Sequence, residues 1–176
     1  YQYLEIFNAV VDANVGRSQG VAENTWDYVL SMGLRIWGCS AMDTHTNLLT
    51  NACNMVYLTE TNETALKAAL MAGNLTFGVN HMLRVDVTND TVYVHTFGES
   101  STIDWICNGA TNKTTSTATS DFYNLSENEM LTRTNIGYVR VRATVTGDTN
   151  RIAWGQPIFY TILPGRTASG LKFLLK

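Results

Sequence analysis

The spacing of apolar residues changes partway along the chain. Between residues 18 and 38, apolar side chains recur every three or four positions, and polar side chains hold the opposite face. This pattern predicts an amphipathic helix, with Ser18 capping its start and Gly38 ending it in a left-handed turn. The same spacing predicts helices over residues 3–15, 48–56 and 63–72, and Gly73 is placed to end the last of them.

After Gly73, apolar and polar residues alternate, which is the period of a β-strand. Residues 81–96 predict a hairpin that turns at Asn89 and Asp90. Residues 138–163 predict a second hairpin, and Pro157 must interrupt its return strand or place it at a sheet edge. Residues 101–107 and 171–175 are lesser strand candidates. We therefore predict a single α+β domain over residues 1–176, with N-terminal helices followed by an antiparallel β-meander sheet.

Residues 108–121 lie between the two predicted hairpins. Their sequence, NGATNKTTSTATSD, holds no strongly apolar side chain. A segment of this kind has little to bury in a core, so we expect an exposed loop rich in Thr and Ser.

The first 20 residues carry many large apolar groups near the terminus: Tyr1, Tyr3, Leu4, Phe7 and Val11. One continuous helix from residue 3 to residue 37 would be about 50 Å long, whereas a compact domain of this size has a radius of gyration of about 16 Å. The helix must fold back at its glycines, or another copy of the chain must cover it. We expect residues 1–20 to protrude and to assemble with copies of the same chain.

A helix placed before a sheet, with Glu5 near the start, is loosely similar to the layout of pilin-like proteins. In those proteins the helix begins with a nearly unbroken apolar run. Here Asn8, Asp12 and Asn14 interrupt the run, so the chain is not assigned to that family.

Five Asn-x-Ser/Thr triplets are candidate acceptors for N-linked glycans, at Asn62, Asn74, Asn89, Asn112 and Asn124. Glycans attach there only if the chain passes through a secretory pathway. A surface rich in Thr and Asn, with few lysines, also favours an extracellular or cell-surface location. We expect glycans on at least two of the sites, with Asn112 and Asn89 the leading candidates.

Charge and hydropathy narrow the range of partners. A formal net charge of -3 gives no field that would gather nucleic acid, and no run of 18 apolar residues predicts a membrane span. The three cysteines match no zinc signature. A disulfide between Cys39 and Cys53, with Cys107 reduced and buried, is the expected arrangement; the alternative is three buried thiols.

Two groups of polar side chains are candidates for chemistry. His45, His81 and His95 invite a metal interpretation, but the hairpin register points His81 and His95 to opposite sides of the sheet, so neither a metal nor a cofactor is expected. The best candidate for a ligand face lies on the outer side of the first hairpin, and arginines of the second hairpin could widen it: Arg84, Asp86, Tyr93, His95, Arg140 and Arg142. The alternative is a solvated sheet face with cross-strand charge pairs.

The sequence holds no local catalytic signature, neither a nucleophile elbow nor a nucleotide-binding loop. Our first hypothesis is therefore a secreted, glycosylated structural subunit of a filament-like homopolymer, and not an enzyme. Two alternatives remain: an extracellular binding module for a small acidic or sugar ligand, and an enzyme with a cone-shaped α+β fold.

Overall fold

The computed structural model describes residues 3–9, 21–43, 52–125 and 136–161. Within these ranges strands outnumber helices. The helices are α3 (Glu23–Ser31) and α4 (Glu63–Ala72). The strands are β1 (Tyr3–Asn8), β2 (Trp37–Ala41), β3 (Ala52–Val56), β4 (Leu75–Val79), β5 (Leu83–Thr88), β6 (Thr91–Thr96), β7 (Ser101–Cys107), β8 (Ala110–Ala118), β9 (Ser120–Asn124), β10 (Ile136–Val145), β11 (Ile152–Gly155) and β12 (Ile158–Thr161).

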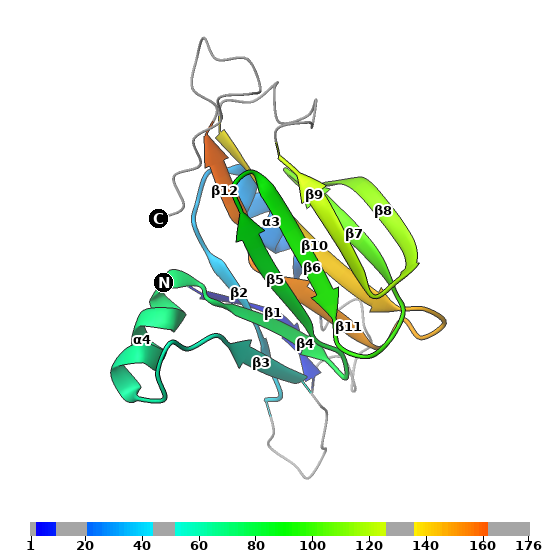
Figure 1. Ribbon diagram of the computed structural model, residues 1–176. Helices are drawn as coiled ribbons and strands as arrows, with labels where there is room; N and C mark the ends of the chain where they lie inside the picture. Colours follow the sequence, from blue (N-terminus) through cyan, green and yellow to red (C-terminus); the bar gives the residue numbers. More distant parts are fainter. Residues whose placement is uncertain (1–2, 10–20, 44–51, 126–135, 162–176) are drawn as a thin grey trace.

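The strands form three sheets. The largest has the order β3-β4-β11-β10-β7-β8, and β12 also pairs with β10. A three-stranded sheet, β5-β6-β9, packs in front of it in the view of Figure 1, and α3 lies behind it. The third sheet pairs β1 with β2 in parallel. The large sheet is thus covered on both faces.

Two cores follow from this layering. One lies between the large sheet and the three-stranded sheet: Leu83, Val92, Val94, Ile103, Trp105, Cys107, Tyr123, Leu125, Val139, Val141, Ala143, Ala153 and Tyr160. The other joins β1 and α3 to the opposite face of the large sheet: Ile6, Phe7, Ala9, Trp26, Leu30, Ala52, Phe77, Val79, Tyr138 and Trp154. Side chains along β10 point alternately to the two faces of the large sheet, so this strand contributes to both cores. Val139 and Val141 face the first core, and Tyr138 and Arg140 face the side of the second.

The predicted fold class, N-terminal helices followed by a meander, is wrong. Residues Tyr3–Asn8 form the strand β1, which pairs in parallel with β2. The irregular register between Glu5 and Phe7 places both Ile6 and Phe7 in the core, so the apolar spacing imitates that of a helix. Over so few residues, apolar spacing does not separate a helix from a buried strand.

The two following helices also differ from the prediction. α3 covers only Glu23–Ser31, and the chain turns at Gly33, whose φ is +81°. Gly38 lies on β2, where a Cβ atom would come within 2.8 Å of the Phe77 and Trp26 rings. The predicted helix over residues 48–56 is the strand β3 where it is described, and Ser18 lies outside the described residues.

Several local predictions are confirmed. α4 begins after Asn62, whose side chain accepts a hydrogen bond from the Ala65 amide, and it ends at Gly73 in a left-handed turn. The hairpin of β5 and β6 turns at Asn89 and Asp90 in the expected register. β10 returns through β11, and Pro157 separates β11 from β12.

Residues 108–121 differ from the expected loop. They contain β8, which pairs with β7, and the start of β9, which pairs with β6. One residue separates these strands, so the chain passes directly from the large sheet to the three-stranded sheet. β8 is mostly exposed, which is why its sequence carries few apolar groups. Neither described helix is long and apolar enough to cross a membrane.

Candidate functional site

A cleft of about 510 Å³ opens where β5, β12, the end of α4 and the start of β2 meet. This volume falls in the range of small-molecule sites. Its lining combines aromatic rings with charged and polar groups, and the groups that matter for recognition are Arg35, Trp37, Tyr57, Arg84, Asp86 and Phe159.

Trp37 and Phe159 form an aromatic wall of the cleft. Their ring centroids lie 5.9 Å apart in an edge-to-face arrangement. The indole nitrogen of Trp37 donates to the Met71 carbonyl at 3.2 Å. Gly73 packs against the same ring, where a Cβ atom would come within 2.5 Å of it. The end of α4 therefore holds Trp37 in place.

Charged side chains stand at the rim. The Arg35 guanidinium carbon lies 5.2 Å from the centroid of the Phe159 ring, which is a cation-π geometry. Arg84 donates to Asp86 Oδ1 from Nε at 3.0 Å and from Nη2 at 2.8 Å. These contacts, first of all the hydrogen bonds, raise the pKa of Arg84 above its ordinary value. Among the described residues that line the cleft, the charged ones are Arg35, Arg84 and Asp86.

The floor of the cleft is fixed by internal hydrogen bonds. The hydroxyls of Tyr57 and Thr76 both donate to the Leu83 carbonyl, at 3.1 and 2.7 Å. Gln156 spans the gap to β2, because its amide nitrogen donates to the Gly38 carbonyl at 2.7 Å and its oxygen accepts from the Gly38 amide at 2.8 Å. The site is therefore formed before any ligand arrives.

The predicted ligand face divides into three parts. Arg84 and Asp86 line the cleft. Their cross-strand partners on β6 are His95 and Tyr93, which lie on the outer face of the three-stranded sheet. Arg140 and Arg142 do not widen that face. They lie on the opposite side of the large sheet, under α3.

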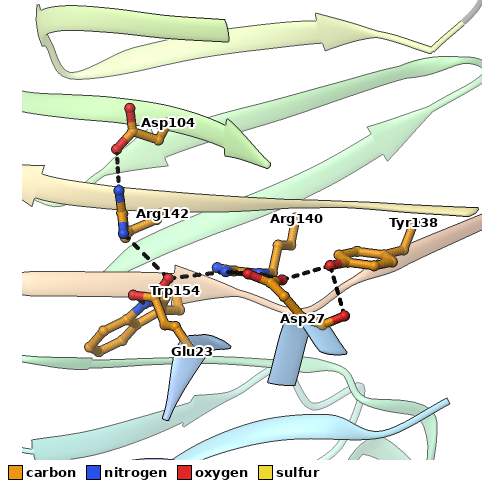
Figure 2. A network of polar contacts seen from close by, with 7 residues as sticks. All are labelled: Glu23, Asp27, Asp104, Tyr138, Arg140, Arg142 and Trp154. Atoms are coloured by element: carbon orange, nitrogen blue, oxygen red, sulfur yellow. Dashed lines mark hydrogen bonds and ion pairs between the residues drawn. The ribbon is translucent and has the colours of Figure 1, made fainter. Parts of the chain in front are cut away.

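A buried network of charged side chains joins α3 to β10 (Figure 2). The guanidinium of Arg140, which is 1% exposed, donates to Asp27 from Nε at 2.8 Å and from Nη2 at 2.6 Å. Nη2 also donates to Glu23 Oε2 at 3.0 Å. Glu23 and Asp27 stand four residues apart on α3, so both carboxylates project from one helix face.

Three more side chains extend this network. The Trp154 indole donates to Glu23 at 2.6 Å, and the Tyr138 hydroxyl donates to Asp27 at 2.7 Å. Arg142 donates to Glu23 at 3.4 Å and to Asp104 at 2.8 Å. Burial, followed by the hydrogen bond to Asp27, raises the pKa of Tyr138. Burial alone would lower the pKa of Arg140, but Asp27 and Glu23 raise it overall.

The carboxylates of this network accept hydrogen bonds from the chain itself. The face of the Trp26 ring also contacts the Arg140 guanidinium, with the carbon 5.1 Å from the ring centroid. Within the described chain, Arg140 Nη1 and Arg142 Nε are buried nitrogens without a hydrogen-bond partner. We interpret the network as a device that fixes α3 on the sheet.

The histidines do not converge. His81 is buried and shares a 3.0 Å hydrogen bond with Ser101, whereas His95 is exposed on β6. His45 lies outside the described residues. In the described part of the chain, no group of three or more His, Cys, Asp and Glu residues is arranged to hold a metal ion.

The three cysteines are free thiols in the structure, so the expected bridge between Cys39 and Cys53 is not formed in it. Cys39 lies on β2 with its sulfur 3.6 Å from the Leu4 carbonyl, and Cys53 lies on β3 with its sulfur 3.3 Å from Met82 Sδ. Burial raises the pKa of the Cys107 thiol to about 11, even though a hydrogen bond with Tyr123 lowers it.

The five acceptor asparagines are all at least partly exposed. Asn62 caps α4, Asn74 follows that helix beside the cleft, and Asn89 occupies the turn between β5 and β6. Asn112 on β8 accepts a hydrogen bond from Tyr123 at 2.7 Å, and Asn124 ends β9.

The expected assembly segment packs on its own domain where it is described. Phe7 is 1% exposed, and the Tyr3 hydroxyl donates to the Leu70 carbonyl. Leu4 is partly buried and packs against the second core. Tyr1 and Val11 lie outside the described residues. Within the described residues, the apolar stripe that we expected to pack on a neighbouring subunit is thus covered by the chain itself.

Sequence reasoning missed most of the cleft. The apolar spacing puts Trp37 on the face of a helix and Phe159 on a return strand, with no signal that the two rings meet. Their contact depends on the pairing of β1 with β2 and of β12 with β10, which joins segments far apart in the sequence. Comparisons with protein-family models, curated proteins and solved structures give no match.

Proposed function

We propose that this chain is an extracellular binding module that holds a small acidic ligand, either a carboxylated ring compound or an acidic sugar, in the cleft. One observation carries the proposal: two guanidinium groups and an aromatic wall line the same preformed cavity. The extracellular location is part of the proposal, and it rests on the five acceptor triplets and their exposure.

The lining suits such a ligand in two ways. The Trp37 and Phe159 rings offer apolar surface for the flat face of a sugar or an aromatic ring. The Arg35 and Arg84 guanidinium groups are planar cations, the kind of group that pairs with a carboxylate. Asp86 opposes an anion but also holds Arg84 in place.

The two other hypotheses have less support. The assembly hypothesis began from an uncovered apolar stripe that includes Phe7, and Phe7 is buried in the chain's own core. The enzyme hypothesis called for a histidine beside a carboxylate in a deep pocket. Neither His81 nor His95 lines the cleft.

The proposal predicts charge-dependent binding. N-acetylneuraminic acid and glucuronic acid should bind in calorimetric titrations, and the methyl ester of each should bind at least roughly tenfold more weakly. Trp37→Ala should remove most of the affinity for the acids. Arg84→Gln should weaken binding roughly threefold, because the group is solvent-exposed, and Asp86→Asn should strengthen it by a similar factor.

Arg151→Gln is the matched control, because Arg151 pairs with Glu99 and does not line the cleft. Its affinity for both acids should equal that of the unmodified chain. Equal binding of acids and esters, or no binding of either acid at millimolar concentration, would overturn the proposal.

A further inference from the structure

Two exposed aromatic side chains lie side by side on the outer face of the three-stranded sheet. Tyr93 on β6 is 40% exposed and Phe122 on β9 is 55% exposed. They are direct cross-strand partners, and their ring centroids lie 6.3 Å apart. Lys113 Nζ lies 5.1 Å from the centroid of the Phe122 ring and donates to the Phe122 carbonyl at 2.6 Å. We call Tyr93 and Phe122 the aromatic pair.

A glycan acceptor lies on the same face. Tyr123 on β9 and Leu125 directly after it are buried, so Phe122 and Asn124 project to the outer side. Two residues along a strand span about 7 Å. Asn124 pairs with Thr91, which places it diagonally across from Tyr93, again at about 7 to 8 Å. A sugar attached to Asn124 thus starts beside both rings.

This arrangement distinguishes Asn124 from the other four acceptors. The residue two positions before the asparagine is Phe122 at this site, whereas it is Glu60, Ala72, Val87 or Ala110 at the others. On a strand, that position shares the face of the asparagine and is one strand repeat away. Among the five acceptors, Asn124 is therefore the one with an aromatic ring at that position.

We infer that Asn124 is a glycosylation site whose first sugar packs on the aromatic pair. A lipid-linked oligosaccharide of the secretory pathway is the donor: Nδ2 of Asn124 loses a proton and bonds to the sugar C1, and the bond from C1 to the lipid pyrophosphate breaks. The C–H groups of the pyranose then contact the negative faces of the Phe122 and Tyr93 rings. The glycan covers the apolar surface that the described chain leaves in water.

The inference shares with the proposed function the assumption of a secretory route, but it does not depend on the cleft. The experiment secretes the full chain from a eukaryotic cell line behind an added signal sequence, so the donor is supplied whatever the natural source. Glycopeptide mass spectrometry then measures the occupancy of each site. No ligand binding enters the measurement, so a failed titration of the cleft leaves this result unaffected.

Stability and sugar chemical shifts test the packing itself. Ser126→Ala removes the acceptor triplet and leaves Asn124 in place; we expect it to lower Tm by about 3 °C when Phe122 is present. In a Phe122→Leu background the same substitution should not change Tm. Protons of the first sugar should show upfield ring-current shifts that Phe122→Leu removes.

Thr64→Ala is the matched control, because it deletes the Asn62 triplet from exposed α4 and keeps the capping side chain. Its effect on Tm should be the same in the unmodified chain and in the Phe122→Leu background. A bare Asn124 in the secreted chain overturns the inference. An occupied Asn124 whose loss lowers Tm equally in the Phe122→Leu background also overturns it.

Discussion

His81 is a buried histidine. It is 5% exposed, shares a hydrogen bond with Ser101, and has Glu99 and Arg151 as its charged neighbours. Burial lowers the pKa of His81 below its ordinary value of 6.5, and Arg151 acts in the same direction, while Glu99 opposes the shift. The unfolded chain therefore binds a proton at His81 more readily than the folded chain does.

This difference predicts a loss of stability on acidification. As pH falls below 6.5, the unfolded state gains a proton that the folded state resists, so the free energy of unfolding decreases until the folded-state pKa is passed. The slope from this one group is at most about 1.4 kcal/mol per pH unit. Urea unfolding between pH 7.5 and pH 5 should show that His81→Gln has a shallower decline than the unmodified chain.

His95→Gln controls for the loss of a histidine at the surface, because His95 is exposed on β6. If His81→Gln and the unmodified chain lose stability in parallel over this pH range, buried His81 is not the source of the decline.

At the residue scale, the part of the site that the sequence could predict comes from one hairpin. Asn89 and Asp90 fix the turn, and the turn fixes the register that sets Arg84 opposite His95. The alternation of apolar and polar residues along β10 also predicts correctly that Arg140 and Val141 point to opposite faces of the sheet. It could not show that a helix covers the polar side, so Arg140 looked like a surface residue although it is buried.

The attachment of α3 to the sheet is the main polar feature at the scale of elements. Glu23 and Asp27 on the helix both form ion pairs with Arg140, and Glu23 also pairs with Arg142. Trp26, between them in sequence, packs on Phe77 with ring centroids 5.7 Å apart. A buried ion pair need not stabilise a fold more than apolar side chains would. Removing one partner is costly, because it leaves the other charge buried without compensation.

Asp27→Ala should therefore destabilise the protein strongly. Arg140 would lose two of its three hydrogen bonds within the network, and the Tyr138 hydroxyl would lose its carboxylate acceptor. We expect the free energy of unfolding to fall by about 3 to 5 kcal/mol. Chemical denaturation measures this change directly.

Glu63→Ala is the control, since Glu63 forms an exposed ion pair with Lys67 on α4. Its effect should stay within about 0.5 kcal/mol. A similarly small effect of Asp27→Ala would mean that the network does not hold α3 in place.

Elements were predictable where a local signal marks their ends. α4 has a capping asparagine and a terminal glycine, and both hairpins have short polar turns between alternating strands. β1 and β3 have no such markers. The two strands are only six and five residues long. They become strands through pairing with β2 and β4, which no short window of sequence contains.

At the scale of the whole molecule, the N-terminal strand completes the second core. Ile6 and Phe7 are fully or almost fully buried, and the Phe7 ring centroid lies 6.3 Å from that of Trp154 on β11. Between β1 and β2 the chain passes through α3, so strand, helix and strand cover one face of the large sheet together. Covering that face requires the first residues of the chain, and no second copy is needed for it.

Phe7→Ala distinguishes this arrangement from a segment that protrudes to assemble. Because Phe7 is 1% exposed, its truncation should lower the free energy of unfolding by about 3 to 5 kcal/mol in urea titrations. Met71→Ala, at a side chain that is 64% exposed on α4, should change it by less than about 0.5 kcal/mol. Sedimentation of the same samples reports association. If Phe7→Ala keeps its unfolding midpoint but abolishes association, Phe7 packs on a neighbouring chain and the intramolecular pairing of β1 with β2 is wrong.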